Sequence, residues 1–225
     1  MSETAGRVLP VYLVADESRS MSPVVDELNA GLRSLHEALL REPLAAAKVR
    51  FSIVGFSDDV IVHSALADLR NETTLPQLTV RGGTAYSAAF TLLLDRLPAD
   101  VRALKREGFA VHRPAVFFLS DGQPTDPGQW ESVYDQLVDR DRTPTGPNII
   151  ACGIGEAKAE TILHVATRPE FAFVATPGVE VGLAIAEFCT ALTRSVIKSG
   201  QAVGGTEAEL VVERPDSFRM AADVL

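Results

Sequence analysis

Oxygen-bearing side chains follow an apolar run near the start of the chain. The run from Val8 to Ala15 is uncharged and contains β-branched and aromatic residues, which predicts a strand buried on both faces of a parallel sheet. Asp16, Ser18 and Ser20 come directly after it, two residues apart. These side chains offer oxygen but neither nitrogen nor sulfur, so the ligand that matches them is a hard cation such as Mg²⁺ or Mn²⁺.

Two later segments carry further polar residues at similar junctions. The run Ala115–Leu119 predicts a second buried strand, and Asp121 follows it. In a doubly wound sheet the first strand lies centrally beside this one, so both carboxyl ends open on the crevice where such sheets bind ligands. Gly82 and Gly83 let a third loop, which carries Thr84, approach closely.

The remaining periodicities predict the elements that position these loops. Helical spacing recurs over residues 24–41, 85–97, 130–139, 158–166 and 179–198. We expect Ser22 and Pro23 to start the first helix as N-cap and first residue, and Pro98 to interrupt the second, which resumes over 99–107. Further strands are expected over residues 49–56, 60–66, 148–154 and 171–175, the first two forming a hairpin.

This alternation of strands and helices predicts an α/β fold. We expect a three-layer, doubly wound, mostly parallel six-stranded sheet, with the second hairpin strand as its one antiparallel edge. A chain of 225 residues, 46% of them apolar, can build one large core. We therefore expect a single domain over residues 1–198. The tail, 199–225, is expected to be flexible at its glycines or docked, with Leu210–Val212 forming a short strand or lying on the surface.

Charge and cysteine content exclude several classes of protein. A net charge of −9 argues against nucleic-acid binding, which needs clustered Lys and Arg. No signal-peptide pattern or apolar span of about 20 residues is present, so we expect a soluble, cytoplasmic protein without membrane insertion. Cys152 and Cys189 lie in apolar stretches and are expected to be buried free thiols.

Taken together, the Asp-x-Ser-x-Ser motif at residues 16–20, Thr84 and Asp121 resemble the metal-ion-dependent adhesion site of von Willebrand factor type A domains, which have a Rossmann-like fold. The resemblance covers residues 8 to about 198. Within this family, the sequence most resembles the bacterial, TerY-like branch associated with tellurite resistance. That similarity is carried by residues 9–13, 82–84 and 121–126.

The resemblance implies a set of metal ligands and a role. Ser18 and Ser20 would bind the metal directly, Thr84 directly or through water, and Asp16 and Asp121 mainly through water. The ion, Mg²⁺ or Mn²⁺, would keep positive character and accept an Asp or Glu from a partner protein. The family further implies a non-enzymatic role in tellurite or stress response, beside an associated kinase and phosphatase.

One position departs from the family pattern. Most members carry a small residue between the two serines, where this chain has Arg19. If the position needs a positive φ, arginine would be strained by about 1 kcal/mol or more. If it does not, Arg19 can reach toward an incoming anion or pair with Glu17. The sequence leaves these alternatives open.

Enzymatic interpretations compete with this one. A haloacid-dehalogenase-type phosphohydrolase would use Asp16 with Mg²⁺, but it needs a second carboxylate two residues on, where this chain has Ser18. A serine hydrolase would need a nucleophile elbow and a placed histidine. A dinucleotide site at Gly153-Ile154-Gly155 lacks its third glycine, because Lys158 stands there.

Structural roles are the simpler interpretation of several other residues. Asp and Ser cap helices and form turns in many proteins, so each motif is weak by itself. Asp126 is expected to be a turn or helix cap, Asp58 and Asp59 a hairpin turn, and Trp130 a helix anchor. The four histidines have no ligand spacing, and we expect structural roles for His36, His63, His112 and His164.

Overall fold

The computed structural model describes residues 6–203 and 210–224. Its strands form one sheet in the order β3-β2-β1-β5-β6-β7-β8, with β4 beside the start of β1. Their bounds are β1 Arg7–Asp16, β2 Val49–Phe56, β3 Val60–Ala67, β4 Ala110–Val111, β5 Ala115–Ser120, β6 Asn148–Gly153, β7 Ala172–Ala175 and β8 Phe218–Met220. Strand β1 pairs in parallel with both β2 and β5, and β3 and β8 run antiparallel to their neighbours. The predicted doubly wound α/β fold is confirmed.

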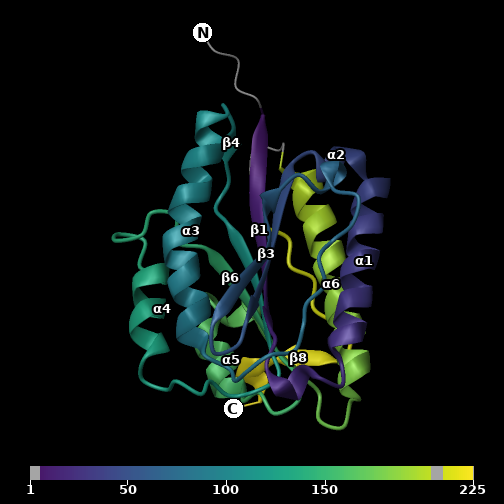
Figure 1. Ribbon diagram of the computed structural model, residues 1–225, viewed down its shortest axis with the longest axis vertical. Helices are drawn as coiled ribbons and strands as arrows, with labels where there is room; N and C mark the ends of the chain where they lie inside the picture. The colour runs from purple at the N-terminus through teal and green to yellow at the C-terminus, as the bar shows by residue number, and fades with distance from the viewer. Residues whose placement is uncertain (1–5, 204–209, 225) are drawn as a thin grey trace.

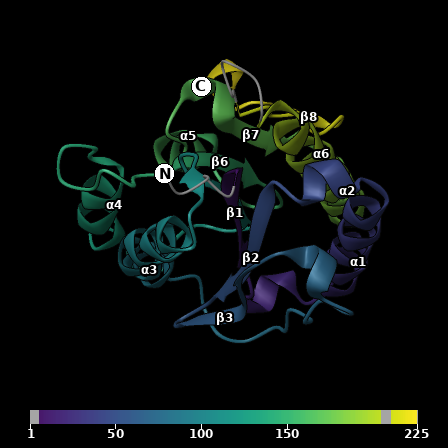
Figure 2. The same cartoon turned by 90° about the horizontal axis from the view of Figure 1, so that it is seen from above.

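Helices cover both faces of this sheet (Figures 1 and 2). Helices α1, α2 and α6 lie on one side, and α3 and α4 lie on the other. Their bounds are α1 Val25–Arg41, α2 Pro43–Ala46, α3 Tyr86–Arg106, α4 Trp130–Val138, α5 Ala159–Val165 and α6 Val181–Ala202. Because the faces of the sheet are covered, β1 and β5 are buried along almost their whole length.

Three features predicted from local sequence patterns differ in the structure. The sheet has eight strands among the described residues rather than six, because β4 and β8 are too short to show an alternating pattern. For the same reason it has two antiparallel edge strands, β3 and β8, rather than the one predicted. Pro98 does not interrupt α3, which runs through it as one helix. Buried residues on both sides of Pro98, such as Leu93 and Val101, hold the two halves of α3 against the core. Ser22 is not an N-cap, because it lies in the turn after the 3₁₀ helix Arg19–Met21, and α1 begins at Val25 without a side-chain cap.

The last described segment packs on the domain and then joins the sheet. Leu210–Val212 docks rather than forming a strand: the amide of Val211 donates to Ser199 Oγ at 2.9 Å, and that of Glu213 donates to Ser195 Oγ at 2.9 Å. Strand β8 then pairs with β7. Gly200 lies in α6, whereas Gly204 and Gly205 lie outside the described residues. Among the described helices, none is long and apolar enough to cross a membrane.

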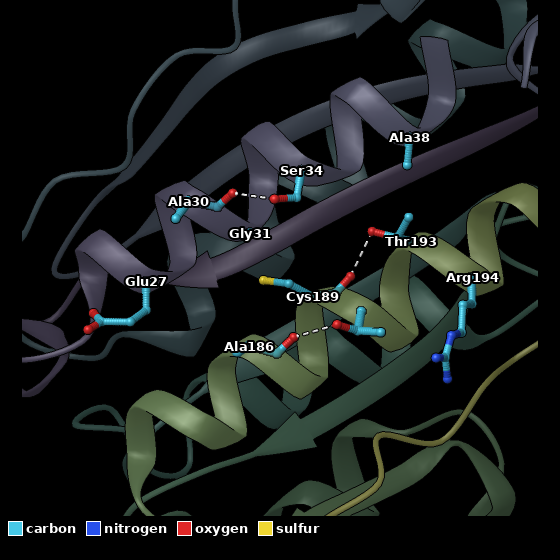
Figure 3. A pocket seen from close by; sticks show the side chains of 10 residues that line it. Glu27, Ala30, Gly31, Ser34, Ala38, Ala186, Cys189, Thr193 and Arg194 are labelled. Atoms are coloured by element: carbon cyan, nitrogen blue, oxygen red, sulfur yellow. Dashed lines mark hydrogen bonds between the residues drawn. The ribbon is translucent and has the colours of Figure 1, made fainter. Parts of the chain in front are cut away.

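Helices α1 and α6 touch where one residue has no side chain (Figure 3). A Cβ on Gly31 of α1 would overlap both Cβ and Sγ of Cys189 on α6. A groove of about 530 Å³ runs between the two helices on either side of this contact. Ser34, Thr190 and Thr193 each donate their hydroxyl to a carbonyl of their own helix. The glycine therefore sets how closely α6 packs on α1.

Candidate metal centre

Asp16 lies at the carboxyl end of the central strand and is held on both sides. Its Oδ1 accepts the backbone amide of Ser18 at 2.8 Å, and its Oδ2 accepts the hydroxyl of Ser120, at the end of β5, at 2.7 Å. The residue is 1% exposed. Because β1 and β5 are adjacent parallel strands, their carboxyl ends open on the same edge of the sheet, as the sequence predicted.

The two motif serines and Asp121 form one hydrogen-bonded chain of oxygens. Ser20 donates to Asp121 Oδ1 at 2.8 Å, and the hydroxyls of Ser18 and Ser20 lie 2.9 Å apart. Since Ser20 has one hydroxyl proton and gives it to Asp121, Ser18 is the donor in the second bond. Ser20 is exposed and Ser18 is buried, so the chain of oxygens leads from the protein interior to the surface.

Thr84 lies beside this chain on the third loop. It is 6% exposed, and its carbonyl accepts the amide of Thr125 at 2.9 Å. A Cβ on Gly122 would lie 4.0 Å from Thr84 Oγ1, so the hydroxyl faces the loop that follows β5. No described hydrogen bond joins this hydroxyl to Ser18 or Ser20. The structure thus links Asp121 directly to the serines, holds Asp16 beneath them, and places Thr84 next to the Asp121 loop.

The two carboxyl groups of the cluster carry uncompensated charge. Burial raises the pKa of Asp16 to about 6, although hydrogen bonds from Ser120 and Ser18 oppose the shift. Burial also raises the pKa of Asp121, against the hydrogen bond from Ser20. Neither carboxylate forms an ion pair with any residue that the structure describes. A cation would therefore lower the electrostatic cost of ionising both.

The donor set fits a hard divalent cation. It consists of three neutral hydroxyls and two carboxylates, all oxygen, which is the chemistry that Mg²⁺ and Mn²⁺ prefer. No cluster of three or more His, Cys, Asp or Glu side chains suited to a metal occurs in the described ranges. The hydroxyls are what complete this site, and for that reason carboxylate or histidine spacing alone does not reveal it.

A buried charged network beneath the site was missed from the sequence. Glu17 has a fully buried side chain, and its carboxylate accepts from Thr79 N and Arg81 Nε at 2.8 Å each, while His63 Nε2 lies 2.8 Å from Oε1. Burial alone would raise the pKa of Glu17, but contacts with His63, Thr79 and Arg81 lower it below its usual value. A Cβ on Gly55 would overlap this carboxylate, so the glycine on β2 makes room for it.

The network fixes the loop that carries Thr84. The amide of Arg81 donates to the carbonyl of Glu17 at 2.6 Å, and the amide of Arg19 donates to the carbonyl of Gly82 at 3.1 Å. Gly82 lies against the carboxylate of the exposed Asp58, which a Cβ at this position would displace. The loop that follows β1 and the Thr84 loop are therefore joined by both main-chain and side-chain bonds.

Asp126 is a helix cap, as predicted, although the helix it caps is distant in sequence. Its carboxylate accepts the amides of Tyr86 at 3.1 Å and Ser87 at 2.9 Å, at the start of α3. The cap joins the Asp121 loop to the Thr84 loop. Together with the Glu17 network, it ties all three site loops to one another.

The structure distinguishes the alternatives for Arg19, which were a strained backbone, a pair with Glu17 and a reach toward an incoming anion. No described residue other than glycine has a positive φ, so Arg19 is not strained. Glu17 is buried with Arg81 and His63, and it does not pair with Arg19, which is exposed. Of the alternatives, only a reach toward an incoming anion stays open.

Several other residues singled out in the sequence have structural roles. His36 Nε2 lies 2.9 Å from the Leu69 carbonyl, and His164 packs on Trp130, which anchors α4 in the core. Cys152 and Cys189 are free and buried, as predicted. Gly153 gives α5 room to pack, because a Cβ there would lie 2.6 Å from Ile162 Cγ1.

The chain is similar to known proteins in both sequence and fold. The sequence matches the family model of the von Willebrand factor type A domain over residues 11–123. A search of curated proteins gives no match. The pilus adhesin SpaC from Lactobacillus rhamnosus GG, in its open conformation, superposes with a TM-score of 0.65 at 14% identity, covering 86% of this chain and 30% of that chain.

Two further solved structures share the fold. The von Willebrand domain of the type V pilus tip protein Mfa5 from Porphyromonas gingivalis has a TM-score of 0.59 at 12% identity, covering 91% of this chain and 99% of that chain. Proximal thread matrix protein 1 from the mussel byssus, with its adhesion-site motif occupied by zinc, has a TM-score of 0.52 at 16% identity, covering 84% of this chain and 46% of that chain. This chain spans less than a third of the length of SpaC. Since the family model matches half of the chain and the fold agrees, the chain belongs to the von Willebrand factor type A domain family.

Proposed function

We propose that this protein is a binding module that recognises a partner protein through a divalent cation held by Asp16, Ser18, Ser20, Thr84 and Asp121. The observation that carries the proposal is the oxygen chain from Ser18 through Ser20 to Asp121, which ends in an unpaired carboxylate at the carboxyl edge of the sheet. When bound, the cation supplies positive charge that an Asp or Glu of the partner can meet. The donor set favours Mg²⁺ or Mn²⁺.

Charge makes such a contact selective. The chain carries a net charge of −9, so an acidic partner is repelled by most of its surface. A cation at Ser18 and Ser20 provides a local exception, and the exposed guanidinium of Arg19 between them adds to it. A zinc-occupied motif in the mussel byssus protein and adhesin relatives among the pilus proteins support this choice of function.

The phosphohydrolase alternative has less support. Asp16 would have to attack a phosphorus atom, but both of its oxygens accept hydrogen bonds and the residue is 1% exposed. Ser18 occupies the position where that chemistry needs a general acid. We therefore propose a non-enzymatic role. A phosphatase assay that stays at background, in wild type and in Asp16→Asn alike, is the expected result.

Calorimetric titration of protein stripped with EDTA tests the metal site. We expect one Mg²⁺ or Mn²⁺ per chain, with affinity reduced by about tenfold or more in Ser18→Ala and Asp121→Ala. Ser34→Ala is the matched control, because its exposed hydroxyl bonds only within α1. Titration with Zn²⁺ shows whether the hydroxyl set discriminates between metals. Absence of heat with all three ions, or equal affinity in the site variants and the control, would overturn the proposal.

The partner is tested separately, in the native host. Pull-downs with Mg²⁺ and with EDTA, using wild type and Asp121→Ala, should recover a protein only from the wild type with metal. Equal recovery under all four conditions would place recognition on another surface.

We further propose a TerY-like role in the cytoplasm, in tellurite or stress response beside a kinase and a phosphatase. A deletion strain that becomes sensitive to tellurite, and that wild type but not Asp121→Ala restores, would support it. Unchanged tolerance to tellurite in the deletion strain would refute it.

A further inference from the structure

A second cavity lies at the carboxyl edge of the sheet, beyond the candidate metal centre. It has a volume of about 240 Å³ and lies among the segments after β6 and β7, the first turn of α6, and β8. Figure 1 shows α5 and β8 at the same lower end of the molecule as the turn after β1. Small and aliphatic residues form most of its wall, among them Gly155, Ala159, Val174, Val179, Val181 and Ala184.

Arg219 is the one charged residue among the described residues that line this cavity. Its Nε is buried and has no hydrogen-bond partner among the described residues, although the residue as a whole is half-buried. No ion pair between its guanidinium and another described residue is formed. Burying such a donor without an acceptor is costly. In a chain with 30 acidic residues, this arginine is left without one of them beside it in the described parts. The cavity therefore presents a positive charge that no described acidic side chain neutralises.

The backbone fixes Arg219 in this position. Strand β8 pairs with β7 and sets Arg219 opposite Val174. The turn before β8 is anchored as well, because both the amide and the hydroxyl of Ser217 donate to Glu187 on α6. The guanidinium is thus presented from a rigid strand rather than from a free tail.

The start of α6 adds positive potential on the same wall. Helix α6 has 22 residues and begins at Val181, after the N-cap residue Glu180, whose exposed side chain forms no capping hydrogen bond and does not line the cavity. Its first amides have no partner within the helix, and its dipole favours negative charge at this end. Val181 and Ala184 of this first turn line the cavity.

We propose that this cavity binds a short aliphatic carboxylate. The guanidinium of Arg219 pairs with the carboxylate, and the aliphatic wall takes a side chain of the size of valine. The volume is below the range of about 300–1,000 Å³ found for drug-sized ligands, which limits the ligand to about one residue. This chemistry is offered by the C-terminal residue of a partner protein and by a free branched-chain acid.

The cavity adjoins the candidate metal centre without depending on it. The amide of Glu156 donates to the carbonyl of Asp121 at 2.9 Å, and a Cβ on Gly155 would lie 3.2 Å from the same oxygen. One partner could therefore reach both places. None of the residues proposed as metal ligands lines the cavity, so it can be tested in EDTA, where failure of the metal site has no effect on the result.

In the test, the full chain in EDTA is titrated with each probe, and binding is measured from the changes in NMR chemical shifts. The probes are isovalerate, the peptide acetyl-Ala-Ala-Val, and the same peptide with a C-terminal carboxamide. We expect the two carboxylates to bind and the carboxamide to bind about tenfold more weakly or not at all. If the peptide binds more tightly than isovalerate, the natural ligand is a protein C-terminus. If isovalerate binds more tightly, the natural ligand is a free acid.

Matched variants separate the site from general charge effects. Arg219→Gln should weaken binding about tenfold, while Arg219→Lys keeps the charge and part of the affinity. Arg214→Gln makes the same charge change at an exposed arginine of the same segment that does not line the cavity, and should bind like wild type. Thermal melts confirm that each variant is folded. Equal binding of acid and carboxamide, equal loss in Arg219→Gln and Arg214→Gln, or no binding at about 10 mM of any probe would overturn the proposal.

Discussion

Arg81 holds Glu17 through both its side chain and its main chain. Its Nε donates to Glu17 Oε2 at 2.8 Å, and its amide donates to the Glu17 carbonyl at 2.6 Å. Its Nη1 also pairs with Asp59, and its Nη2 donates to the Gly55 carbonyl at 3.1 Å. Glu17 stands between Asp16 and Ser18, and Arg81 stands three residues before Thr84. The protein thus fixes two site loops against each other through a buried charge pair.

Replacing Glu17 with Gln should destabilise the fold by about 2–4 kcal/mol, because it removes the buried counter-charge of Arg81 and leaves its guanidinium only the exposed carboxylate of Asp59. Urea denaturation measures the change. Glu37→Gln is the control, since its pair with Arg41 is exposed on both sides and should contribute less than about 0.5 kcal/mol. Similar losses in the two variants would show that the Glu17 network does not support the domain.

The ionisation of Asp16 should make the metal-free protein less stable as pH rises. Burial raises its pKa from 3.8 to about 6, so the folded protein holds this proton more tightly than the unfolded chain does. The group therefore weakens the fold progressively between pH 3.8 and about 6. Asp16→Asn removes this cost and should be more stable than wild type by up to about 3 kcal/mol at neutral pH in EDTA.

The check is a set of urea denaturations below, within and above that pH range. The advantage of Asp16→Asn should be absent at the acid end, grow through the range, and shrink when Mg²⁺ is added to the wild type. A difference that stays constant with pH would mean that the Asp16 charge is already compensated in the folded protein.

Substituting Gly31 with Ala should destabilise the protein by about 1–3 kcal/mol, although alanine favours helix by about 1 kcal/mol. The added Cβ overlaps Cβ and Sγ of Cys189, so α1 and α6 must move apart (Figure 3). The double variant Gly31→Ala/Cys189→Gly moves the small residue to the other helix and should recover part of the loss. Gly182→Ala is the control on α6, because its Cβ would meet Glu27 at an ordinary 3.8 Å. Strictly additive effects in the double variant would contradict the contact.

Neither cysteine should react with a thiol reagent in the folded protein. Cys152 and Cys189 are 2% and 3% exposed. Burial raises the pKa of Cys189 to about 12 and raises that of Cys152 as well, so little thiolate forms at neutral pH. Labelling with Ellman's reagent across a urea series should follow the unfolding transition. Fast labelling of Cys189 before that transition would show that the α1–α6 groove opens in the native state.

The sequence determined the alternation of elements and the residues of the candidate centre. Apolar runs and helical spacing are local patterns, so they located β1, β5 and the main helices within a few residues. Asp16, Ser18, Ser20, Thr84 and Asp121 follow from their positions at strand-to-helix junctions, because the carboxyl ends of adjacent parallel strands open on one edge.

Tertiary structure decided which charges are buried and what balances them. Glu17 resembles any turn residue in sequence, yet its partners lie 46 to 64 residues away, on β3 and in the Thr79–Arg81 segment. The same holds for the Asp126 cap, 40 residues from Tyr86, and for the lack of a described partner at Arg219. Burial and hydrogen bonding depend on groups brought together by the whole fold, and local spacing carries no record of them.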